Sequence, residues 1–514
     1  MGRENAEFRN GQWESIEALV GRKRLLVVQR TGWGKSLVYF LATKLLRDRG
    51  AGLTLLISPL ISLMRNQILA TKNLNIIAET INSSNVDEWE SISQKLLEDQ
   101  IDILLISPER LSNERFHENV LRNIAHRVGL FVVDEAHCIS DWGHDFRPDY
   151  KRIVRILRAL PSNIPLLATT ATANNRVGED VARQLGNLEV IRGPLVRNSL
   201  RLQNIWLPNP ATRMAWLAET LPKIPGNGII YTLTRRDAER VAKWLRSKGL
   251  NVRAYHSETE NREILEEMLL SNDLKALVAT VALGMGFDKP DLAFVVHFQR
   301  PGSVVHYYQQ VGRAGRAVDS AYGVLLSGDE DKEITDYFIS TAFPPRQNVE
   351  KILTILDEAK EGLSIRMLEE RINVRYSDIE KVLRLLAVEN PSPIVKQGNH
   401  WFRTAVDFSM NWDQVERLNN QRRSEQHVML EYMKTGVCLM KFLSDALDDP
   451  HAEKCGKCDN CVGASLLPEK PSDSLINEAV FLKRSHQAVE PRRLWPSPSP
   501  FRIYGWKGRI SGDL

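Results

Sequence analysis

The sequence feature that most constrains the fold is a buried-strand pattern that runs into a glycine-rich turn. The stretch LLVVQRTGWGKS, residues 25–36, is followed at once by the apolar residues VYFLA of a helix. A strand, a tight glycine turn and a helix in this order are typical of a phosphate-binding loop, because glycines let backbone N–H groups point at phosphates. The pattern predicts an α/β fold with a doubly wound parallel sheet that binds a nucleotide.

The phosphate loop gives each of its polar residues a predicted role. We expect Lys35 to neutralise the β and γ phosphates of ATP and the Ser36 hydroxyl to ligate Mg²⁺. Gln29 stands where such loops usually place their first glycine, so a glycine-rich turn without a nucleotide remains the alternative. The other residues of the predicted phosphate site are Thr31, Gly32, Trp33 and Gly34.

A second apolar run, residues 130–133, ends in an acidic pair. Asp134 is expected to hold Mg²⁺ through water, and Glu135 to orient or deprotonate the attacking water. An isolated Asp-Glu pair is usually a solvated strand end, but together with a phosphate loop it favours a nucleotide hydrolase. Three further stretches, 58–67, 106–111 and 166–174, contain Ser or Thr beside apolar residues and predict more parallel-strand ends of the same sheet.

A second α/β unit is indicated by residues 227–249 and 276–291 and continues to 316. It has no phosphate loop of its own, so we expect it to close over the nucleotide of the first unit. Arg313 and Arg316 lie three residues apart among glycines, which suits a pair that reaches across the cleft to the γ-phosphate. Such an arginine finger contributes roughly 10³ to 10⁵ in rate. The alternative is a solvated helix face.

Four of the five cysteines lie close together, at Cys438, Cys455, Cys458 and Cys461. Thiolates at this spacing are typical of a tetrahedral Zn²⁺ site, whereas buried free cysteines would have no such spacing. We expect the zinc to support folding rather than catalysis. Cys138 stands apart and is interpreted as a small packing residue.

Length and composition limit the class of protein. A chain of 514 residues with 43% hydrophobic residues should form several domains, and its net charge of +4 is spread too evenly to indicate a partner. No apolar run approaches the ~20 residues of a membrane span, and the N-terminal residues lack the apolar core of a secretory signal. These features predict a cytoplasmic protein.

Together these elements resemble the superfamily 2 helicases, and DEAHCISDWGHDFRPDY, residues 134–150, resembles the RecQ family of DNA helicases. The resemblance covers roughly residues 5–340 and 412–463 and includes FRNGQ, ATTATA, GMGFDKPD and QQVGRAGR in family order. It implies two RecA-like domains, ATP and Mg²⁺ between them, a zinc-binding module, and single-stranded and forked DNA as the partner.

The resemblance also implies roles for single residues. Gln12 would contact the edge of the adenine base, with Phe8 and Arg9 nearby. Asp288 lies on the motif that couples the second domain to ATP and DNA. The residues implied on the γ-phosphate side are Gln309, Arg313 and Arg316.

The aromatic residues after the acidic pair gain a function from the same resemblance, which implies that this loop contacts single-stranded DNA and signals its presence to the ATP site. Trp142 and Phe146 would stack against bases, and Arg147 would meet a phosphate. Stacking contributes ~1 to 3 kcal/mol per base and tolerates any sequence. The alternative, that both aromatic side chains are buried, is disfavoured by their polar neighbours.

Residues 344–408 depart from the family pattern, since a winged helix usually follows the zinc module and here precedes it. Apolar periodicity predicts helices near 349–356 and 379–386, a capping box predicts the start of the latter at Ser377 and Glu380, and 393–404 reads as a hairpin. The helix near 379–386 and the hairpin are the expected DNA contacts. A helical spacer that only packs on the motor is the alternative.

The predicted organisation has five parts. They are a first RecA-like ATPase domain at 1–205, a second RecA-like domain at 206–343, the winged helix at 344–408, the zinc-binding module at 409–465 and a Pro-rich basic tail at 466–514.

The function implied is an ATP-dependent DNA helicase that moves 3′ to 5′ on single strands, in DNA recombination, repair or related processing. Three alternatives stay open at this point: a translocase that remodels DNA without separating strands, an RNA helicase, and an ATP-gated DNA-binding module without catalysis.

Overall fold

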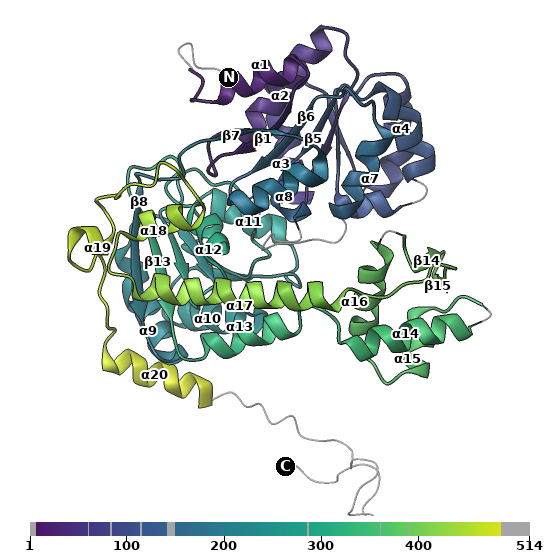
Figure 1. The fold of residues 1–514 in the computed structure, drawn as a ribbon. Coiled ribbons are helices and arrows are strands. Elements are labelled where there is room, and N and C mark those ends of the chain that lie inside the picture. The colour runs from purple at the N-terminus through teal and green to yellow at the C-terminus, as the bar shows by residue number, and fades with distance from the viewer. Residues whose placement is uncertain are drawn as a thin grey trace, which may run out of the picture.

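The computed structural model describes residues 7–59, 61–82, 85–113, 116–140, 150–284, 287–359, 361–389 and 391–484. Two parallel sheets with helices on their faces form most of the molecule, and a long helix connects them to a small unit at one end (Figure 1). Within these ranges, no helix is both long enough and apolar enough to cross a membrane.

The first sheet has seven parallel strands in the order β3-β4-β2-β5-β6-β1-β7. Its strands are β1 (Arg24–Val28), β2 (Thr54–Ile57), β3 (Ala78–Ile81), β4 (Ile103–Ile106), β5 (Leu130–Val133), β6 (Leu166–Thr170) and β7 (Glu189–Arg192). Its helices are α1 (Gln12–Val20), α2 (Lys35–Asp48), α3 (Ile61–Lys72), α4 (Trp89–Leu97), α6 (Arg122–Ile124), α7 (Lys151–Ala159) and α8 (Asn175–Leu185).

This sheet is buried on both faces, which explains why its strands read as continuous apolar runs. Leu26 and Val28 pack in one hydrophobic core, while Leu25 and Val27 of the same strand pack in another on the opposite face. The register sets Val28 beside Thr170, so the phosphate loop begins at the same sheet edge as the residues that follow β6.

The second sheet has six parallel strands in the order β10-β11-β9-β12-β13-β8. Its strands are β8 (Leu200–Trp206), β9 (Gly228–Tyr231), β10 (Val252–Tyr255), β11 (Ala276–Ala279), β12 (Phe294–His297) and β13 (Ala321–Ser327). Its helices are α9 (Pro210–Thr220), α10 (Arg235–Ser247), α11 (Arg262–Leu270), α12 (Val304–Val311) and α13 (Asp331–Ser340). The predicted fold class, two doubly wound parallel sheets, is confirmed.

A small unit with its own core follows. It consists of α14 (Arg346–Glu358), α15 (Ile365–Arg371), α16 (Tyr376–Ala387) and an antiparallel hairpin of β14 (Ile394–Gln397) and β15 (His400–Arg403). This is the winged-helix order of elements, and the hairpin expected at 393–404 is present. The predicted capping box is wrong: α16 begins at Tyr376, and its N-cap residue Arg375 makes no side-chain cap. The Tyr376 N–H donates instead to Glu369 Oε1 at 3.1 Å.

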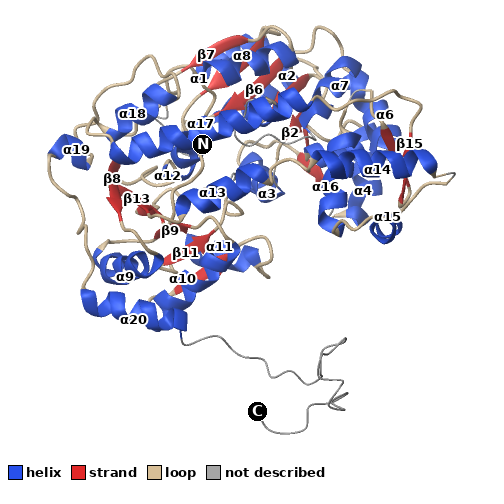
Figure 2. Ribbon diagram, turned by 60° about the horizontal axis from the view of Figure 1, so that its bottom comes forward, coloured by secondary structure: helices blue, strands red, loops and turns tan. Residues whose placement is uncertain are grey.

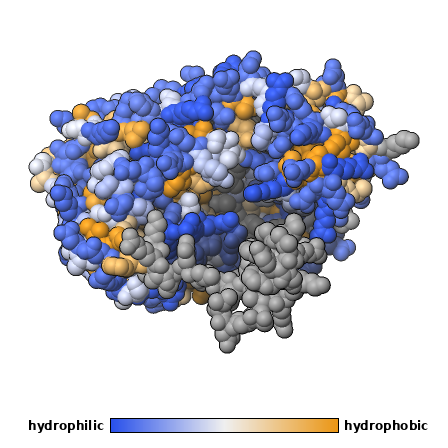
Figure 3. Space-filling view, turned by 90° about the horizontal axis from the view of Figure 1, so that it is seen from below, coloured by the Kyte–Doolittle hydropathy of each residue, from blue (hydrophilic) through white to orange (hydrophobic). Residues whose placement is uncertain are grey.

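The long helix α17 (Trp412–Lys434) runs along the second domain, with the small unit at one end and α18 (Leu439–Ala446) and α19 (Asp459–Val462) at the other (Figures 1 and 2). Hydrophilic residues cover most of the face seen in Figure 3, and hydrophobic residues lie there in separate patches.

The prediction of a Pro-rich tail at 466–514 is wrong for the first part of that segment. Residues 473–484 form the helix α20 (Asp473–Arg484), which packs on α9 with Ala479 fully buried. The connection to it is held to the second domain, since the indole of Trp216 donates to the carbonyl of Pro468 at 2.6 Å. These contacts with α9, which lies much earlier in the sequence, fix the position of the segment on the second domain. The remaining part, 485–514, lies outside the described residues.

Candidate nucleotide and metal sites

Residues from both sheets meet around a cavity of about 330 Å³. The phosphate loop and the acidic pair come from the first sheet, and the remaining walls come from the second. The lining includes most of the residues that the sequence predicts for an ATP site: Thr31, Gly32, Gly34, Lys35, Ser36, Asp134, Glu135, Asp288, Gln309, Arg313 and Arg316.

The phosphate loop has the backbone conformation that its glycines allow. Gly34 has a φ of +98° immediately before α2, and a side chain there would meet the Gln12 amide nitrogen at 2.8 Å. Gln29, in place of the usual glycine, is buried and its side chain lies against Gly193, where a Cβ would come within 2.3 Å of it. The glutamine is therefore accommodated behind the loop.

Lys35 begins α2, and its ammonium donates to the Gln29 carbonyl at 3.0 Å. Burial lowers the pKa of Lys35, while the carboxylates of Glu135 and Asp134 act in the opposite direction. A buried cation beside two carboxylates at a helix N-terminus is suited to a ligand with several negative charges.

The acidic pair follows β5 directly. Asp134 accepts a hydrogen bond from the Thr169 hydroxyl at 2.6 Å and another from the Gln67 amide at 3.1 Å. Burial first, and then the Glu135 carboxylate, raise the pKa of Asp134. Glu135 has a φ of +51°, an unfavourable backbone conformation for a residue with a side chain, and such conformations occur often at functional sites.

Thr169 and Gln67 are site residues that the sequence analysis did not single out. Both lie within runs that it read only as strand ends, at 166–174 and 58–67. A hydroxyl and an amide that position a carboxylate have no sequence pattern of their own, so only their place beside the acidic pair identifies them.

Two side chains of the second domain face the first. The Gln309 amide donates to the Thr172 hydroxyl at 2.8 Å, across the cleft. Arg316 pairs with Asp288 at 2.5 Å, and burial lowers the pKa of Arg316 against the effect of this carboxylate. Arg313 donates to the Phe287 carbonyl at 2.8 Å. Gln309 thus bridges the two domains, and Arg316 is held beside the cavity by an exchangeable ion pair.

The predicted adenine-reading residues lie against the phosphate loop. The Gln12 amide donates to the Trp33 carbonyl at 2.8 Å and accepts from the backbone N–H of Arg9 at 2.9 Å. The Arg9 guanidinium also contacts the Gly32 carbonyl. Phe8 is 45% exposed and stacks loosely on Trp13. This motif therefore braces the loop and leaves an aromatic side chain accessible.

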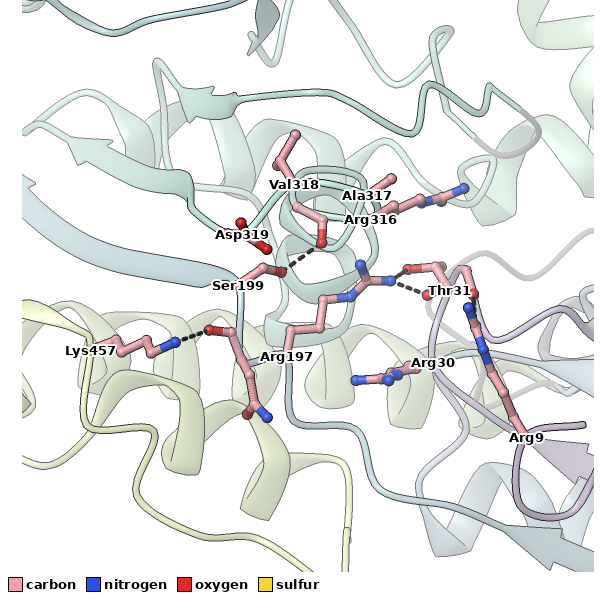
Figure 4. A pocket seen from close by; sticks show the side chains of 13 residues that line it. Arg9, Arg30, Thr31, Arg197, Ser199, Arg316, Ala317, Val318, Asp319 and Lys457 are labelled. Atoms are coloured by element: carbon pink, nitrogen blue, oxygen red, sulfur yellow. Dashed lines mark hydrogen bonds between the residues drawn. The ribbon is translucent and has the colours of Figure 1, made fainter. Parts of the chain in front are cut away.

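A larger cavity of about 640 Å³ adjoins the phosphate loop on the side shown in Figure 4. It shares Thr31, Gly32 and Arg316 with the first cavity and is rich in cations. The charged side chains around it are Arg9, Arg30, Arg197, Arg316, Lys457 and Asp319. Arg30 lies in the phosphate-loop stretch but was given no predicted role, and Arg197 belongs to no motif of the sequence.

The four clustered cysteines come together as predicted. Their sulfur atoms all lie within 4.8 Å of one another, with Cys438 Sγ 3.5 Å from Cys455 Sγ and 3.9 Å from Cys458 Sγ. A tetrahedral zinc ion with Zn–S bonds of about 2.3 Å places its sulfurs about 3.8 Å apart, so the cluster fits Zn²⁺. Cys438 and Cys458 belong to a hydrophobic core of the second domain, which is where a structural metal would stabilise the packing.

The predicted DNA-contacting residues Trp142, Phe146 and Arg147 lie outside the described residues. The segments on both sides are described. The Ser140 hydroxyl donates to Asp180 of α8 at 2.7 Å, and the buried Tyr150 donates from its hydroxyl to the Asp134 carbonyl at 3.4 Å. The first described residue after these three positions, Tyr150, therefore lies beside the acidic pair.

Three segments of the chain match known protein families. Residues 9–181 match the DEAD/DEAH box helicases, residues 212–318 the helicase conserved C-terminal domain, and residues 376–462 the RecQ zinc-binding domain. The last match begins in α16 and so includes the hairpin and α17 as well as the four cysteines.

Whole-chain relatives agree with these matches. The ATP-dependent DNA helicase RecQ of Synechocystis is 31% identical over 479 residues, which are 88% of this chain and 95% of that protein. The RecQ of Haemophilus influenzae is 38% identical over 326 residues, 62% of this chain and 51% of that protein. The chain thus spans about half the length of the Haemophilus relative.

Among solved structures, the DUF1998 helicase MrfA bound to DNA is similar with a TM-score of 0.54 and 17% identity, over 81% of this chain and 62% of that one. At this identity the likeness shows the fold alone.

Two RecA-like sheets that share one phosphate loop across a common cavity define the class of superfamily 2 helicases, and both helicase family matches agree. Within that class, the match to the RecQ zinc-binding domain and the Synechocystis relative show that the chain belongs to the RecQ family.

Proposed function

We propose that this chain is an ATP-dependent DNA helicase that translocates 3′ to 5′ on single-stranded DNA and unwinds duplex DNA. The observation that carries the proposal is the shared cavity, where the phosphate loop and acidic pair of one sheet face Gln309, Arg313 and Arg316 of the other. Family membership supports DNA as the substrate, and the direction of movement follows from the resemblance of the motifs.

In the proposed mechanism the phosphate loop binds ATP through its backbone N–H groups and through Lys35, which exchanges the Gln29 carbonyl for the phosphates. Ser36 and Asp134 would hold Mg²⁺, which neutralises charge on the β and γ oxygens. Glu135 orients the attacking water and accepts its proton. Thr169 and Gln67 keep the Asp134 carboxylate in place.

Closure of the cleft moves Arg316 from Asp288 to the γ-phosphate, where its charge stabilises the transition state. Gln309 already contacts the first domain and so couples closure to the nucleotide. After hydrolysis the phosphate leaves, Arg316 returns to Asp288, and the cleft reopens. Alternate closure and opening advance the motor along the strand.

DNA contact is assigned to the loop that contains Trp142, Phe146 and Arg147, with stacking as the main source of affinity. Tyr150, the first described residue after these three, bonds to the Asp134 carbonyl, which supports a short path from bound DNA to the ATP site. The hairpin of the small unit exposes Lys396 and His400 and is the proposed second contact.

The four cysteines would hold Zn²⁺, which supports the fold around α18 and α19. The proposal includes a cytoplasmic location, because these thiols need a reducing compartment. It also includes a role in DNA recombination, repair or a related process.

The test is a fluorescent strand-separation assay with DNA and RNA forks of both polarities, run beside an ATPase assay. We expect ATP-dependent unwinding of DNA forks that carry a 3′ single-stranded tail. Unwinding of RNA but not DNA would overturn the substrate, and hydrolysis without unwinding would favour a translocase. Lys35→Ala is the control, since full activity in that variant would discard the ATP site.

A further inference from the structure

The segment that joins the two sheets, residues 193–199, is held at nearly every position. The backbone N–H of Leu195 donates to Asp449 at 2.7 Å, and the carbonyl of Val196 accepts from Arg30 at 2.7 Å. The Asn198 carbonyl accepts from the Lys457 ammonium at 2.8 Å. The connection between the domains is therefore clamped by the phosphate loop on one side and by the cysteine module on the other.

Arg197 is directed from this segment to the phosphate loop, as Figure 4 shows. Its guanidinium donates to the Thr31 hydroxyl at 2.7 Å and also contacts the Thr31 carbonyl. The Thr31 hydroxyl in turn donates to the Gly312 carbonyl at 2.9 Å. One threonine thus joins Arg197, the phosphate loop and the turn that carries Arg313 and Arg316.

This junction is tightly packed. A Cβ on Gly32 would lie 3.4 Å from Arg316 and 3.5 Å from Arg197, and a Cβ on Gly312 would lie 3.1 Å from the Thr31 hydroxyl. A shift of the phosphate loop therefore has to move the arginine turn or break the Arg197 contacts, because close-packed groups transmit displacement.

The charge of Arg197 forms no ion pair with a described carboxylate, and the nearby Asp288 offsets only part of the cost of its burial. The side chain is 5% exposed, and no carboxylate of the described residues lies within ion-pair distance of it. Burial lowers the pKa of Arg197 to about 10, so the guanidinium stays charged at neutral pH. A buried cation without a carboxylate is costly unless an anion joins it. The adjoining phosphate site is where such an anion would bind.

We propose that Arg197 is a positioning residue of the ATPase, which fixes Thr31 between the phosphate loop and the turn of Arg313 and Arg316. Lys457 holds the segment of Arg197 in place from within the cysteine module. The inference rests on the proposed function, since it assumes that the phosphate loop binds ATP. It gives this module a link to the nucleotide in addition to its structural role.

The experiment is a fluorescence titration of the full chain with mant-ATP and mant-ADP, without DNA. Arg197→Lys keeps the charge but replaces a planar fork with one ammonium, which cannot keep the same contacts to both Thr31 oxygens. We expect the Kd of mant-ATP to rise roughly tenfold, because one charge-assisted hydrogen bond is lost. The Kd of mant-ADP should rise less. Arg201→Lys, an exposed arginine four residues on, is the matched control and should bind both nucleotides like wild type.

The partner variants are Thr31→Val, which removes the hydroxyl, and Thr31→Ser, which keeps it. If Arg197 acts through Thr31, the double variant Arg197→Lys, Thr31→Val should bind mant-ATP no more than about twofold more weakly than the weaker single variant. If the losses of mant-ATP affinity in the two single variants multiply in the double variant, the connection between Arg197 and Thr31 is refuted.

A merely structural role makes a different prediction. If the role of Arg197 is only structural, the variant should have a lower melting temperature and should bind mant-ATP and mant-ADP more weakly by the same factor. That result would also refute the proposal. Should Arg197→Lys fail to fold, the exposed Lys457→Gln decides: about a two- to threefold weaker binding of mant-ATP supports the link, and unchanged binding overturns it. If wild type binds neither nucleotide, it is the proposed function that fails.

Discussion

The two sheets have the same parallel architecture but contribute opposite chemistry to the cavity between them. The first supplies the loop for the phosphates together with the carboxylates Asp134 and Glu135, while the second supplies Arg313 and Arg316. Neither set can stabilise phosphoryl transfer alone, because the transition state needs water activation on one side and charge neutralisation on the other. In the proposed reaction the catalytic unit is therefore the cleft rather than either domain, and Glu135→Gln and Arg316→Ala each change one side of it.

The largest effect is expected from the first domain, for Glu135→Gln. The amide keeps the size of the side chain but cannot accept the proton of the attacking water, so kcat for ATP should fall by about 10³ or more. Nucleotide binding should change little, because the loop and Lys35 are intact. Steady-state phosphate release beside mant-ATP titration measures both. Equal losses in binding and turnover would show that Glu135 only stabilises the loop.

The second domain should show a loss of about 10³ in kcat for Arg316→Ala. The reason is that Arg316 is half-buried beside the cavity and, among the described residues, forms its ion pair with the exposed Asp288, which it can exchange for a phosphate. Asp288→Asn is the informative companion: it removes the competing carboxylate and should lower kcat far less. If Asp288→Asn were as damaging as Arg316→Ala, the ion pair itself would be the functional element.

DNA sensing is assigned to the first domain and is tested by Trp142→Ala. Basal ATP hydrolysis should persist while its stimulation by single-stranded DNA is lost, because Tyr150, the first described residue after Trp142, bonds to the Asp134 carbonyl of the acidic pair. Trp206→Ala, which removes a half-exposed indole from β8, is the control and should be stimulated normally. Full stimulation of Trp142→Ala would move DNA sensing elsewhere, and the winged helix would be tested next.

The sequence predicts well those features that are encoded by neighbours in the chain. The buried strands are apolar on both faces, so β1, β5 and β6 were recognisable from their composition. The Cys455 to Cys461 spacing is local, and so is the hairpin around the turn at Gly398, whose φ is +60°. The resemblance of the motifs implied a place on the γ-phosphate side for the second domain's arginines, and both line the shared cavity.

What the sequence did not predict depends on contacts between distant segments. Arg197 lies in a short connection without a motif, and its importance appears only when Thr31 lies beside it. The helix α20 was predicted to be part of the tail, because the core that its buried face joins is formed by distant residues, including those of α9. The start of α16 was placed at Ser377, but Glu369 seven residues before Tyr376 provides the acceptor instead. In each case tertiary structure supplies the partner.

The smallest expected effect is on the free energy of unfolding, through a pH dependence that arises in the second domain. His297 ends β12, is fully buried between Tyr231 and Tyr307, and donates from Nε2 to the amide oxygen of Gln310 at 2.7 Å. Burial lowers the pKa of His297 from 6.5 to about 4, although Gln310 opposes the shift. A depressed pKa means that the unfolded chain binds the proton more readily. The stability that comes from the neutral ring is therefore complete above about pH 6.5 and is lost as pH falls toward 4.

At about 1.36 kcal/mol per pKa unit, this linkage removes about 2 kcal/mol between pH 7.5 and pH 5. His297→Gln cannot titrate, so its free energy of unfolding should fall less over that interval than that of wild type, as measured by urea denaturation. His427→Gln, at an exposed histidine of α17, should behave like wild type. An identical pH dependence in wild type and His297→Gln would mean that acid sensitivity arises elsewhere. The Asp134 carboxyl of the first domain would not be that source, because its raised pKa makes the first domain gain stability rather than lose it as pH falls.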